Sequence, residues 1–311
     1  MLLHLVHETR YRYKPQVENA HHVLHLKPAS HAGQQLLQHS LTISPEPTQV
    51  QELPDVYGNA RTFFSLRVPH EKLTVTADSV VSTLAVNTTS KDLSWGLPWE
   101  QVREQFRYQA GGAYDSACEF VFASPYVPRD DAFAEFARPS FTPGRPLPEV
   151  AQDLMERIHA RMTYESDSTD VGTLALEALQ AGKGVCQDFA HIMVACCRAM
   201  GVPARYVSGY MLTNPPPGKP RLIGSDASHA WASVYCPAVS AGSGMTLAAG
   251  QTSGVWLDFD PTNNRAPGED YITLATGRDF LDVSPMRGVI RGGARHVLDV
   301  AVTVTPLPQP D

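Results

Sequence analysis

Hydrophobic and polar residues alternate over the first 83 residues in short runs that turn residues separate. In Phe64, Leu66 and Val68 the apolar positions are two apart, the period that places side chains on one face of a strand. Prolines and the pair Gly58-Asn59 interrupt the runs. This pattern predicts strands over 2–13, 23–26, 36–43, 63–68 and 73–81, and we expect them to form an antiparallel β-sandwich.

The period lengthens in the second half of the chain. Val150, Leu154, Ile158 and Met162 recur every four residues, as on one face of a helix. Gly201 and Pro203 provide the stop signals of a later helix. The spacing predicts helices over 150–162, 173–180 and 186–200.

Strand-like runs follow these helices at 205–211, 229–236, 255–260, 271–274 and 297–304. Helices followed by strands, without βαβ alternation, are typical of an α+β fold with an antiparallel sheet. We therefore expect an N-terminal β-sandwich domain over 1–90 and an α+β core over 146–311. Between them, residues 91–145 are rich in glycine and proline and predict a connector with short helices.

Composition narrows the classes of protein. The chain has 311 residues, 43% of them hydrophobic and 18% charged, which is typical of a folded soluble protein. The net charge of −7 opposes binding to phosphate backbones, so we expect no nucleic-acid partner. Glycines interrupt the one basic cluster, which we interpret as a solvated loop. It contains Arg287, Arg291, Arg295 and His296.

No signal-peptide core and no apolar run of about 18 residues occurs, so we expect a cytoplasmic protein without a membrane partner. The five cysteines are an odd number and predict reduced thiols rather than a disulfide framework. Eight of the twelve histidines lie in the first 70 residues without recurrent ligand spacing, so we interpret them as histidines on the surface of the sheet. We expect no metal and no cofactor.

Cys186 is the residue that most clearly suggests chemistry. It begins a predicted helix, where backbone N–H groups and the helix dipole favour a thiolate. A thiolate nucleophile needs a base, and histidine suits this task near neutral pH. His191 lies about 140° around the helix and points elsewhere. His229 opens a strand, and the next strand brings Asp258 and Asp260, either of which can fix the tautomer of a histidine.

Several motifs resemble those of the bacterial transglutaminase-like proteins, which often carry the label cysteine protease. They are Gly184-Val185-Cys186-Gln187-Asp188-Phe189-Ala190, Arg205-Tyr206-Val207-Ser208-Gly209-Tyr210, the His229 segment and Asp260-Pro261-Thr262. Gly277-Arg278-Asp279-Phe280 and Asp282-Val283-Ser284-Pro285 resemble the C-terminal segment of that family. The resemblance extends to the N-terminal β-domain, and it implies a transglutaminase/papain-like core with helices packed on an antiparallel sheet.

The resemblance also implies roles for individual residues. Cys186 is expected to be the nucleophile and His229 the acid/base. Asp260 is expected to be the orienting carboxylate, because the family places it directly before Pro-Thr. The backbone N–H of Cys186 is expected to be one donor of the oxyanion site, and Tyr164 is a candidate for the second.

Three further residues lie beside these motifs. Asp188 and Asp226 are either hydrogen-bonding supports of the site or turn and cap residues. We expect Trp231 to pack beneath the site.

These residues predict acyl transfer from a peptide or protein substrate through a thioester. Water as acceptor gives a protease or amidase, and an amine gives a transglutaminase. We favour hydrolysis, because the chain shows no acidic EF-hand-type calcium loop and because of the label of the family. A non-catalytic binding scaffold is a third possibility, against which the complete Cys, His and Asp set argues.

Overall fold

The computed structural model of the protein describes residues 1–84, 93–111, 114–166, 168–213, 228–237 and 254–308. Its largest sheet contains seven antiparallel strands from both ends of the chain. They are β1 (Leu2–Leu24), β2 (Gln34–Ser44), β3 (Gln49–Pro54), β4 (Ala60–Leu66), β5 (His70–Thr83), β12 (Met286–Gly292) and β13 (Arg295–Leu307).

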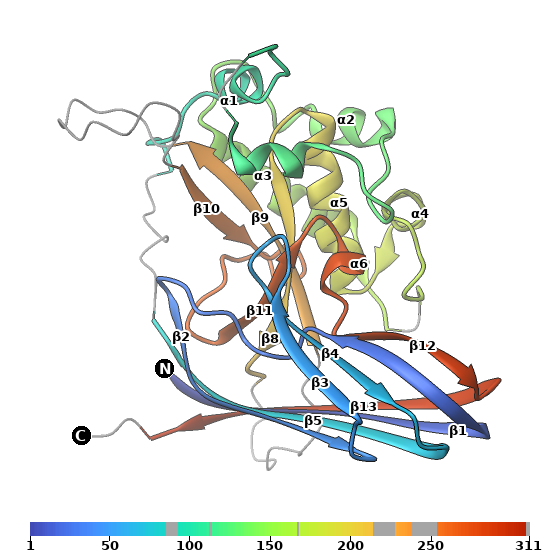
Figure 1. Cartoon of the computed structure of the whole chain (residues 1–311). Helices are drawn as coiled ribbons and strands as arrows, with labels where there is room; N and C mark the ends of the chain where they lie inside the picture. The colour runs from blue at the N-terminus through green and yellow to red at the C-terminus, as the bar shows by residue number, and fades with distance from the viewer. Residues whose placement is uncertain (85–92, 112–113, 167, 214–227, 238–253, 309–311) are drawn as a thin grey trace.

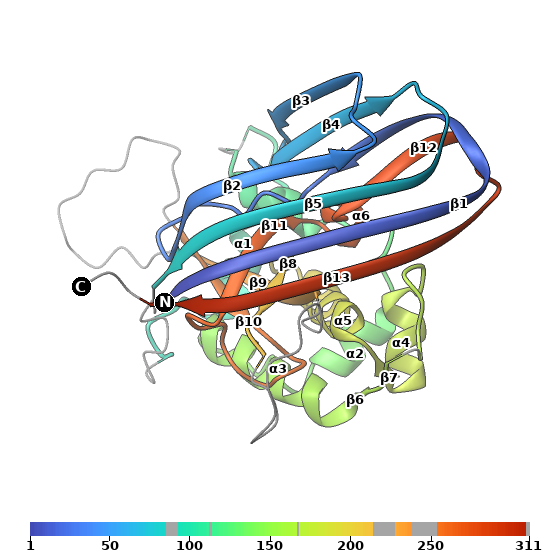
Figure 2. The same cartoon turned by 90° about the horizontal axis from the view of Figure 1, so that it is seen from below.

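The long strand β1 organises this sheet. Its first half pairs with β5 on one side and β13 on the other, and its second half pairs with β4 and β12. Figure 2 shows β1 and β13, the first and last strands, side by side. We expected a β-sandwich over 1–90. Instead, hydrogen bonds join all seven strands into one sheet, and β1 covers both of the strands predicted over 2–13 and 23–26.

Two sequence interpretations require correction here. Residues 286–307, which we expected within the core range 146–311, belong to this N-terminal sheet. The cluster from Arg287 to His296 is not a solvated loop, because it lies in β12 and β13 and the turn between them. Most side chains of β12 are exposed or half-buried, so the strand lacks the apolar alternation that would have revealed it.

The histidines of the N-terminal sheet are not all on its surface. His7, His22, His25 and His70 are buried, contrary to our expectation. His7 Nδ1 lies 2.8 Å from the hydroxyl oxygen of Tyr210, which belongs to the second sheet. Burial lowers the pKa of His7 and of His22 to about 4. The period of two correctly predicts the strands, but it does not show that other elements cover their faces.

Helices and a second sheet form the rest of the molecule. The connector contains α1 (Trp99–Gln105), the 3-10 helix η1 (Ser116–Val121) and α2 (Asp131–Ala137). The three longer predicted helices are α3 (Leu147–Arg161), α4 (Ala175–Ala181) and α5 (Cys186–Ala199). The second sheet is antiparallel with the order β10-β9-β8-β11. Its strands are β8 (Ala204–Met211), β9 (Ser228–Pro237), β10 (Gly254–Phe259) and β11 (Tyr271–Gly277).

Figure 1 shows the helices on one side of the four-stranded sheet and the seven-stranded sheet below it. The largest apolar core lies between the helices and this sheet and includes Leu154, Phe189, Ile192, Val234 and Phe259. A second cluster, with Leu3, Leu5, Tyr210, Ile272 and Val304, joins the two sheets. Among the described residues, no helix combines the length and the apolar character needed to cross a membrane.

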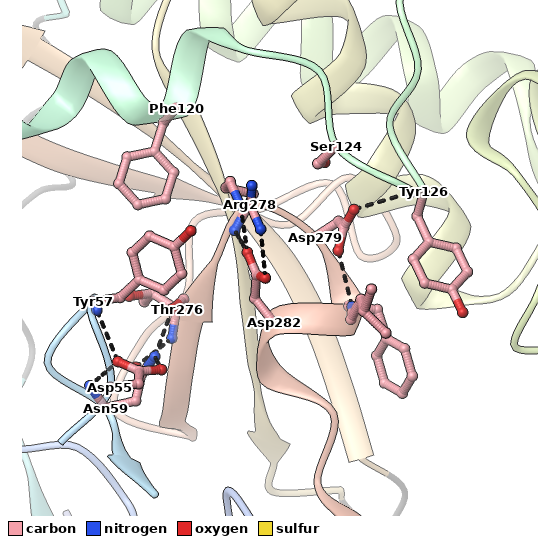
Figure 3. Close-up of polar contacts among 12 residues, drawn as sticks. Asp55, Tyr57, Asn59, Phe120, Ser124, Tyr126, Thr276, Arg278, Asp279 and Asp282 are labelled. Carbon is pink, nitrogen blue, oxygen red and sulfur yellow. Dashed lines mark hydrogen bonds and ion pairs between the residues drawn. The ribbon is translucent and has the colours of Figure 1, made fainter. Parts of the chain in front are cut away.

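Polar contacts also join the two sheets, as Figure 3 shows. Asp55 accepts hydrogen bonds from the N–H groups of Tyr57 and Asn59 and so shapes the turn that precedes β4. Asn59 then bonds both backbone groups of Thr276 in β11: its Nδ2 donates to the carbonyl oxygen, and its Oδ1 accepts from the N–H, each at 2.8 Å. One buried carboxamide therefore attaches the N-terminal sheet to the edge of the core.

The segment after β11 is the one that resembles the C-terminal segment of the family. Arg278 forms a two-pronged ion pair with Asp282 in the short helix α6 (Phe280–Val283). Asp279 accepts hydrogen bonds from the N–H groups of Leu281 and Tyr126, each at 2.9 Å. Asp279 thereby caps α6 and ties it to the connector, as Figure 3 shows. These contacts give the charged residues of this segment a positioning role.

Candidate active site

The start of α5 positions Cys186. Two short parallel strands, β6 (Thr163–Tyr164) and β7 (Lys183–Gly184), hold the chain just before it. The carboxylate of Asp188 accepts hydrogen bonds from the Val185 N–H at 2.8 Å and from the Thr169 hydroxyl at 2.7 Å. A Cβ at Gly184 would lie 2.5 Å from this carboxylate, so the glycine is needed there. These contacts fix the first turn of the helix, which carries the sulfur.

Cys186 lies beside the first residues of β9, the strand that carries His229. Its Sγ is 3.9 Å from the carbonyl oxygen of Ser228, the residue before His229. The half-buried sulfur packs against a small cluster that contains Tyr206, Phe280 and Val283. Helix α6, and with it the family-like C-terminal segment, therefore forms one wall beside Cys186.

His229 connects Cys186 with a buried carboxylate. Its Nε2 lies 2.7 Å from Oδ2 of Asp260, and the nearby thiol of Cys186 contributes to the raised pKa of the ring. Because Asp260 occupies Nε2, Nδ1 is left to face the sulfur. Asp260 has no exposed surface, and His229 is 8% exposed. The start of α5, the start of β9 and the turn after β10 thus bring a thiol, an imidazole and a carboxylate together.

The surroundings of His229 favour its charged form. Burial lowers the pKa of His229, but the hydrogen bonds to Asp260 and Cys186 and the charges of both groups raise it to about 10. Burial raises the pKa of Asp260, but the hydrogen bond and charge of His229, with hydrogen bonds from Asn263 and Tyr271, lower it below its usual value. These shifts describe an imidazolium at His229 beside a carboxylate at Asp260.

Two residues that the sequence analysis did not identify hold Asp260. The hydroxyl of Tyr271 and Nδ2 of Asn263 each donate to Asp260 Oδ2 at 2.7 Å. The N–H groups of Thr262 and Asn263 donate to Oδ1 at 2.9 and 3.2 Å. Asn263 lies three residues after Asp260, so a turn motif could have suggested it. Tyr271 comes from another strand, and no local pattern indicates its contact.

The structure places the other candidate residues as follows. Tyr164 is 54% exposed, and its backbone lies beside Gly184, so its expected role at an oxyanion stays a prediction. Asp188 is a cap residue, the second of the two roles that we considered. Asp226 lies outside the described residues. His229 pairs with Asp260 and not with Asp258, which lines a cavity instead.

Trp231 packs beneath the site, as expected. It is fully buried, and its ring meets that of Tyr271 edge-on, with centroids 5.4 Å apart. Gly209, across from it in β8, leaves room for this ring, because a Cβ there would collide with it. His191 is buried between the rings of Tyr126 and Tyr206 and accepts a hydrogen bond from the Phe280 N–H. His191 therefore supports α6 rather than facing the sulfur.

All five cysteines are free thiols. Cys196, Cys197 and Cys236 are buried, and burial raises the pKa of each. Within the described parts of the chain, no three histidine, cysteine or carboxylate side chains gather closely enough to hold a metal ion.

The fold and the grouping of Cys186, His229 and Asp260 point to one protein family. The transglutaminase-like superfamily matches residues 135–261, which include Cys186, His229 and Asp260. The bacterial transglutaminase-like N-terminal region matches residues 3–82. The chain belongs to the transglutaminase-like proteins of bacterial type, which confirms the resemblance seen in its motifs.

Individual relatives extend over nearly the whole chain. An uncharacterised protein of Mycobacterium tuberculosis is 41% identical over 309 residues, which cover 97% of this chain and 92% of that protein. An uncharacterised protein of Mycobacterium leprae is 29% identical and covers 98% and 99%. The crystal structure of a "Putative Cysteine Protease" from Cytophaga hutchinsonii is similar with a TM-score of 0.71 and 20% identity, covering 100% of this chain and 92% of that one. This last likeness shows a shared fold.

Proposed function

We propose that the protein catalyses thiol-dependent acyl transfer on a peptide or carboxamide, with Cys186 as nucleophile, His229 as acid/base and Asp260 as orienting carboxylate. One observation carries the proposal: His229 contacts Cys186 while its Nε2 lies 2.7 Å from the buried Asp260. Membership of the transglutaminase-like superfamily supports it.

Each group has a defined step in this reaction. The Cys186 thiolate attacks the carbonyl carbon, and the N–H of Cys186 at the start of α5 stabilises the resulting oxyanion. The His229 imidazolium donates its proton to the leaving amine, which departs and leaves a thioester. Neutral His229 then accepts a proton from the incoming water or amine as that group attacks the thioester. The product leaves, and the Cys186 thiolate and the His229 imidazolium are restored.

A first experiment tests the nucleophile. Purified protein is treated with limiting iodoacetamide at pH 7, and labelled peptides are quantified by mass spectrometry. We expect Cys186 to be labelled at least about tenfold faster than Cys118, because its neighbour His229 is an imidazolium. Cys118 is a matched control: it is also half-buried, but burial raises the pKa of its thiol. Equal rates at the two cysteines would refute the proposal.

A second experiment distinguishes hydrolysis from transamidation. The protein is incubated with a peptide library in H₂¹⁸O, with and without methylamine, and the products are read by mass. Hydrolysis, which we favour, adds ¹⁸O to a new carboxylate, whereas transamidation adds methylamine. Both products should vanish in Cys186→Ala. If neither product forms and Cys186 shows no selective labelling, the chain is a binding scaffold.

A further inference from the structure

A cavity of about 750 Å³ lies between the two sheets, away from Cys186. One wall is the face of the four-stranded sheet that carries Arg205, Trp231 and Asp258. The opposite rim comes from the N-terminal part, at residues 29–34 and at the turn from Tyr57 to Asn59 that Figure 3 shows beside Thr276. Cys186, His229 and Asp260 do not line it. The cavity therefore excludes the three proposed catalytic side chains, but it shares Trp231 and Tyr271 with the residues that support His229 and Asp260.

The strand register places two opposite charges in one row across the cavity wall. Arg205 in β8 and Asp258 in β10 are both paired with Ser233 of β9, so the three residues lie side by side on the sheet. Since residues paired across strands point to the same face, Arg205 and Asp258 face the cavity from the two sides of Ser233. The backbones of Arg205 and Asp258 are two strand spacings, or about 10 Å, apart. The side chains form no ion pair within 4.0 Å, although the charge of Asp258 raises the pKa of Arg205.

Two buried donors of this wall have no hydrogen-bond partner in the described part of the chain. One is Nε of Arg205, although its guanidinium stacks on the ring of Trp256. The other is the indole Nε1 of Trp231, which is fully buried in the cavity wall. The charge of Asp258 acts on Arg205 and on His31, which also lines the cavity. Burial lowers the pKa of Arg205 to about 10, so the group is still a cation at neutral pH. Buried donors and charges of this kind usually have partners.

The rest of the lining is mixed: apolar and aromatic side chains lie beside Arg205, whereas Ser30, His31 and Thr273 add polar groups elsewhere. The guanidinium of Arg205 lies 4.2 Å from the ring centre of Trp256, and Val207 and Leu257 flank it. A lone anion would be attracted by Arg205 but repelled by Asp258. A lone cation would be attracted by Asp258 but repelled by Arg205. A molecule with both charges on an apolar body satisfies both groups at once.

We propose that this cavity binds a small zwitterion, an amino acid or short peptide with a free ammonium group, a free carboxylate and an apolar side chain. The carboxylate pairs with Arg205 and Trp231 Nε1, and the ammonium group pairs with Asp258. The motif Arg205-Tyr206-Val207-Ser208-Gly209-Tyr210 then has a function of its own: Arg205 binds the ligand, and Gly209 makes room for Trp231.

The test follows the indole N–H signals of the four tryptophans by ¹⁵N–¹H NMR during titration with L-phenylalanine. We expect the Trp231 signal, assigned with Trp231→Phe, to shift in a saturable way below about 10 mM. The Trp99 signal is an internal control, because its Nε1 already donates to the Thr142 carbonyl oxygen at 3.0 Å. No saturable shift of Trp231 with any zwitterion would overturn the proposal.

Matched ligands and variants identify the two charge contacts. L-phenylalaninamide lacks the carboxylate and N-acetyl-L-phenylalanine lacks the ammonium group, and each should bind at least about tenfold more weakly. Arg205→Gln should abolish the preference over the amide, and Asp258→Asn the preference over the N-acetyl compound. If Arg205→Gln does not fold, Arg205→Lys and Asp258→Asn still test the pairing. Unchanged preferences in the folded variants would overturn the proposal.

Two further measurements test which class of molecule binds and whether binding is independent of Cys186. Glycyl-L-phenylalanine carries its charges farther apart, so tighter binding than L-phenylalanine indicates a short peptide, and weaker binding a free amino acid. Cys186→Ala should bind as tightly as the unaltered protein, because the cavity does not include Cys186. Failure of the acyl-transfer proposal therefore leaves this proposal standing, and loss of binding in Cys186→Ala would contradict it.

Discussion

Asp258 and Asp260 show how the position of a carboxylate along the chain decides whether it meets His229. Both carboxylates lie near the end of one strand, two residues apart, so alternation places them on the same face. Asp260 lies just after β10 in a turn that bonds back from Arg265, and this brings its side chain to His229. Asp258 remains within the strand and faces the cavity.

Replacing Asp260 should make the His229 imidazolium easier to deprotonate. In Asp260→Asn, the charge that raises the pKa of His229 is lost, so we expect this pKa to fall by at least one unit. The step in the pH profile of Cys186 alkylation that reports loss of the His229 proton should then move to lower pH by the same amount. The measurement is the alkylation rate between pH 5 and 10.

Asp78→Asn is the matched control for this variant. Asp78 also pairs with a histidine, since its Oδ1 lies 3.0 Å from His4 Nε2, but this pair is on the surface of the N-terminal sheet. It should leave the rate at Cys186 unchanged. If the two variants behave alike, Asp260 does not act through His229.

At the scale of the element, the start of α5 depends on one cap. Asp188→Ala removes the acceptor of the Val185 N–H and frees the turn before Cys186. We expect a loss of about 1–2 kcal/mol in the free energy of unfolding, measured in urea. We also expect slower alkylation of Cys186, because the sulfur is no longer held beside His229.

Glu177→Ala separates these two effects. Glu177 plays the same part in α4, where it accepts from the Leu174 N–H at 3.1 Å, but it does not support Cys186. The variant should also lower the free energy of unfolding, without slowing alkylation. Slower alkylation in Glu177→Ala would show that stability alone, rather than the position of the cap, controls the thiol.

Elements with one apolar face were predictable, and elements without one were not. The helices α3 and α5 follow their apolar spacing to within a few residues, since each packs a continuous stripe against the core. The strands β3 and β12 were missed. All residues of β3 are exposed, and most of β12 is not buried, so neither has the alternation that a buried face imposes.

At the scale of the whole molecule, the side chain of Asn59 links the two sheets by hydrogen bonds. Asn59→Ala removes both bonds to Thr276 and leaves two backbone groups without these partners. Because Asn59 is buried, we expect the free energy of unfolding to fall by about 2 kcal/mol. The measurement is urea unfolding followed by circular dichroism, with exposed Gln101→Ala as control. An equal effect of the two variants would show that the hydrogen bonds between Asn59 and Thr276 contribute nothing to the free energy of unfolding.

Buried histidines should make the molecule sensitive to acid. The pKa of His7 and of His22 is lowered from 6.5 to about 4 by burial, so between these pH values the unfolded chain binds more protons than the folded one. The free energy of unfolding should therefore fall as the pH drops from 6.5 to 4, by up to a few kcal/mol for each group.

The check is urea unfolding at pH 7 and pH 4.5, repeated with His7→Asn and His22→Asn. Each variant should reduce the difference between the two pH values. His296→Asn, on the outer strand β13, is the control and should leave the difference unchanged. An unchanged pH dependence in both buried-site variants would contradict the assignment.

The sequence by itself determined the class of the molecule and, to within a few residues, the helices α3 and α5. It also predicted Cys186 as a nucleophile, because helix position, spacing and motifs are local properties. Only the tertiary structure decided which groups meet. It brought Tyr271 to Asp260, Asn59 to Thr276, and the last strand beside the first. These contacts depend on strand pairing between distant segments, which no local period encodes.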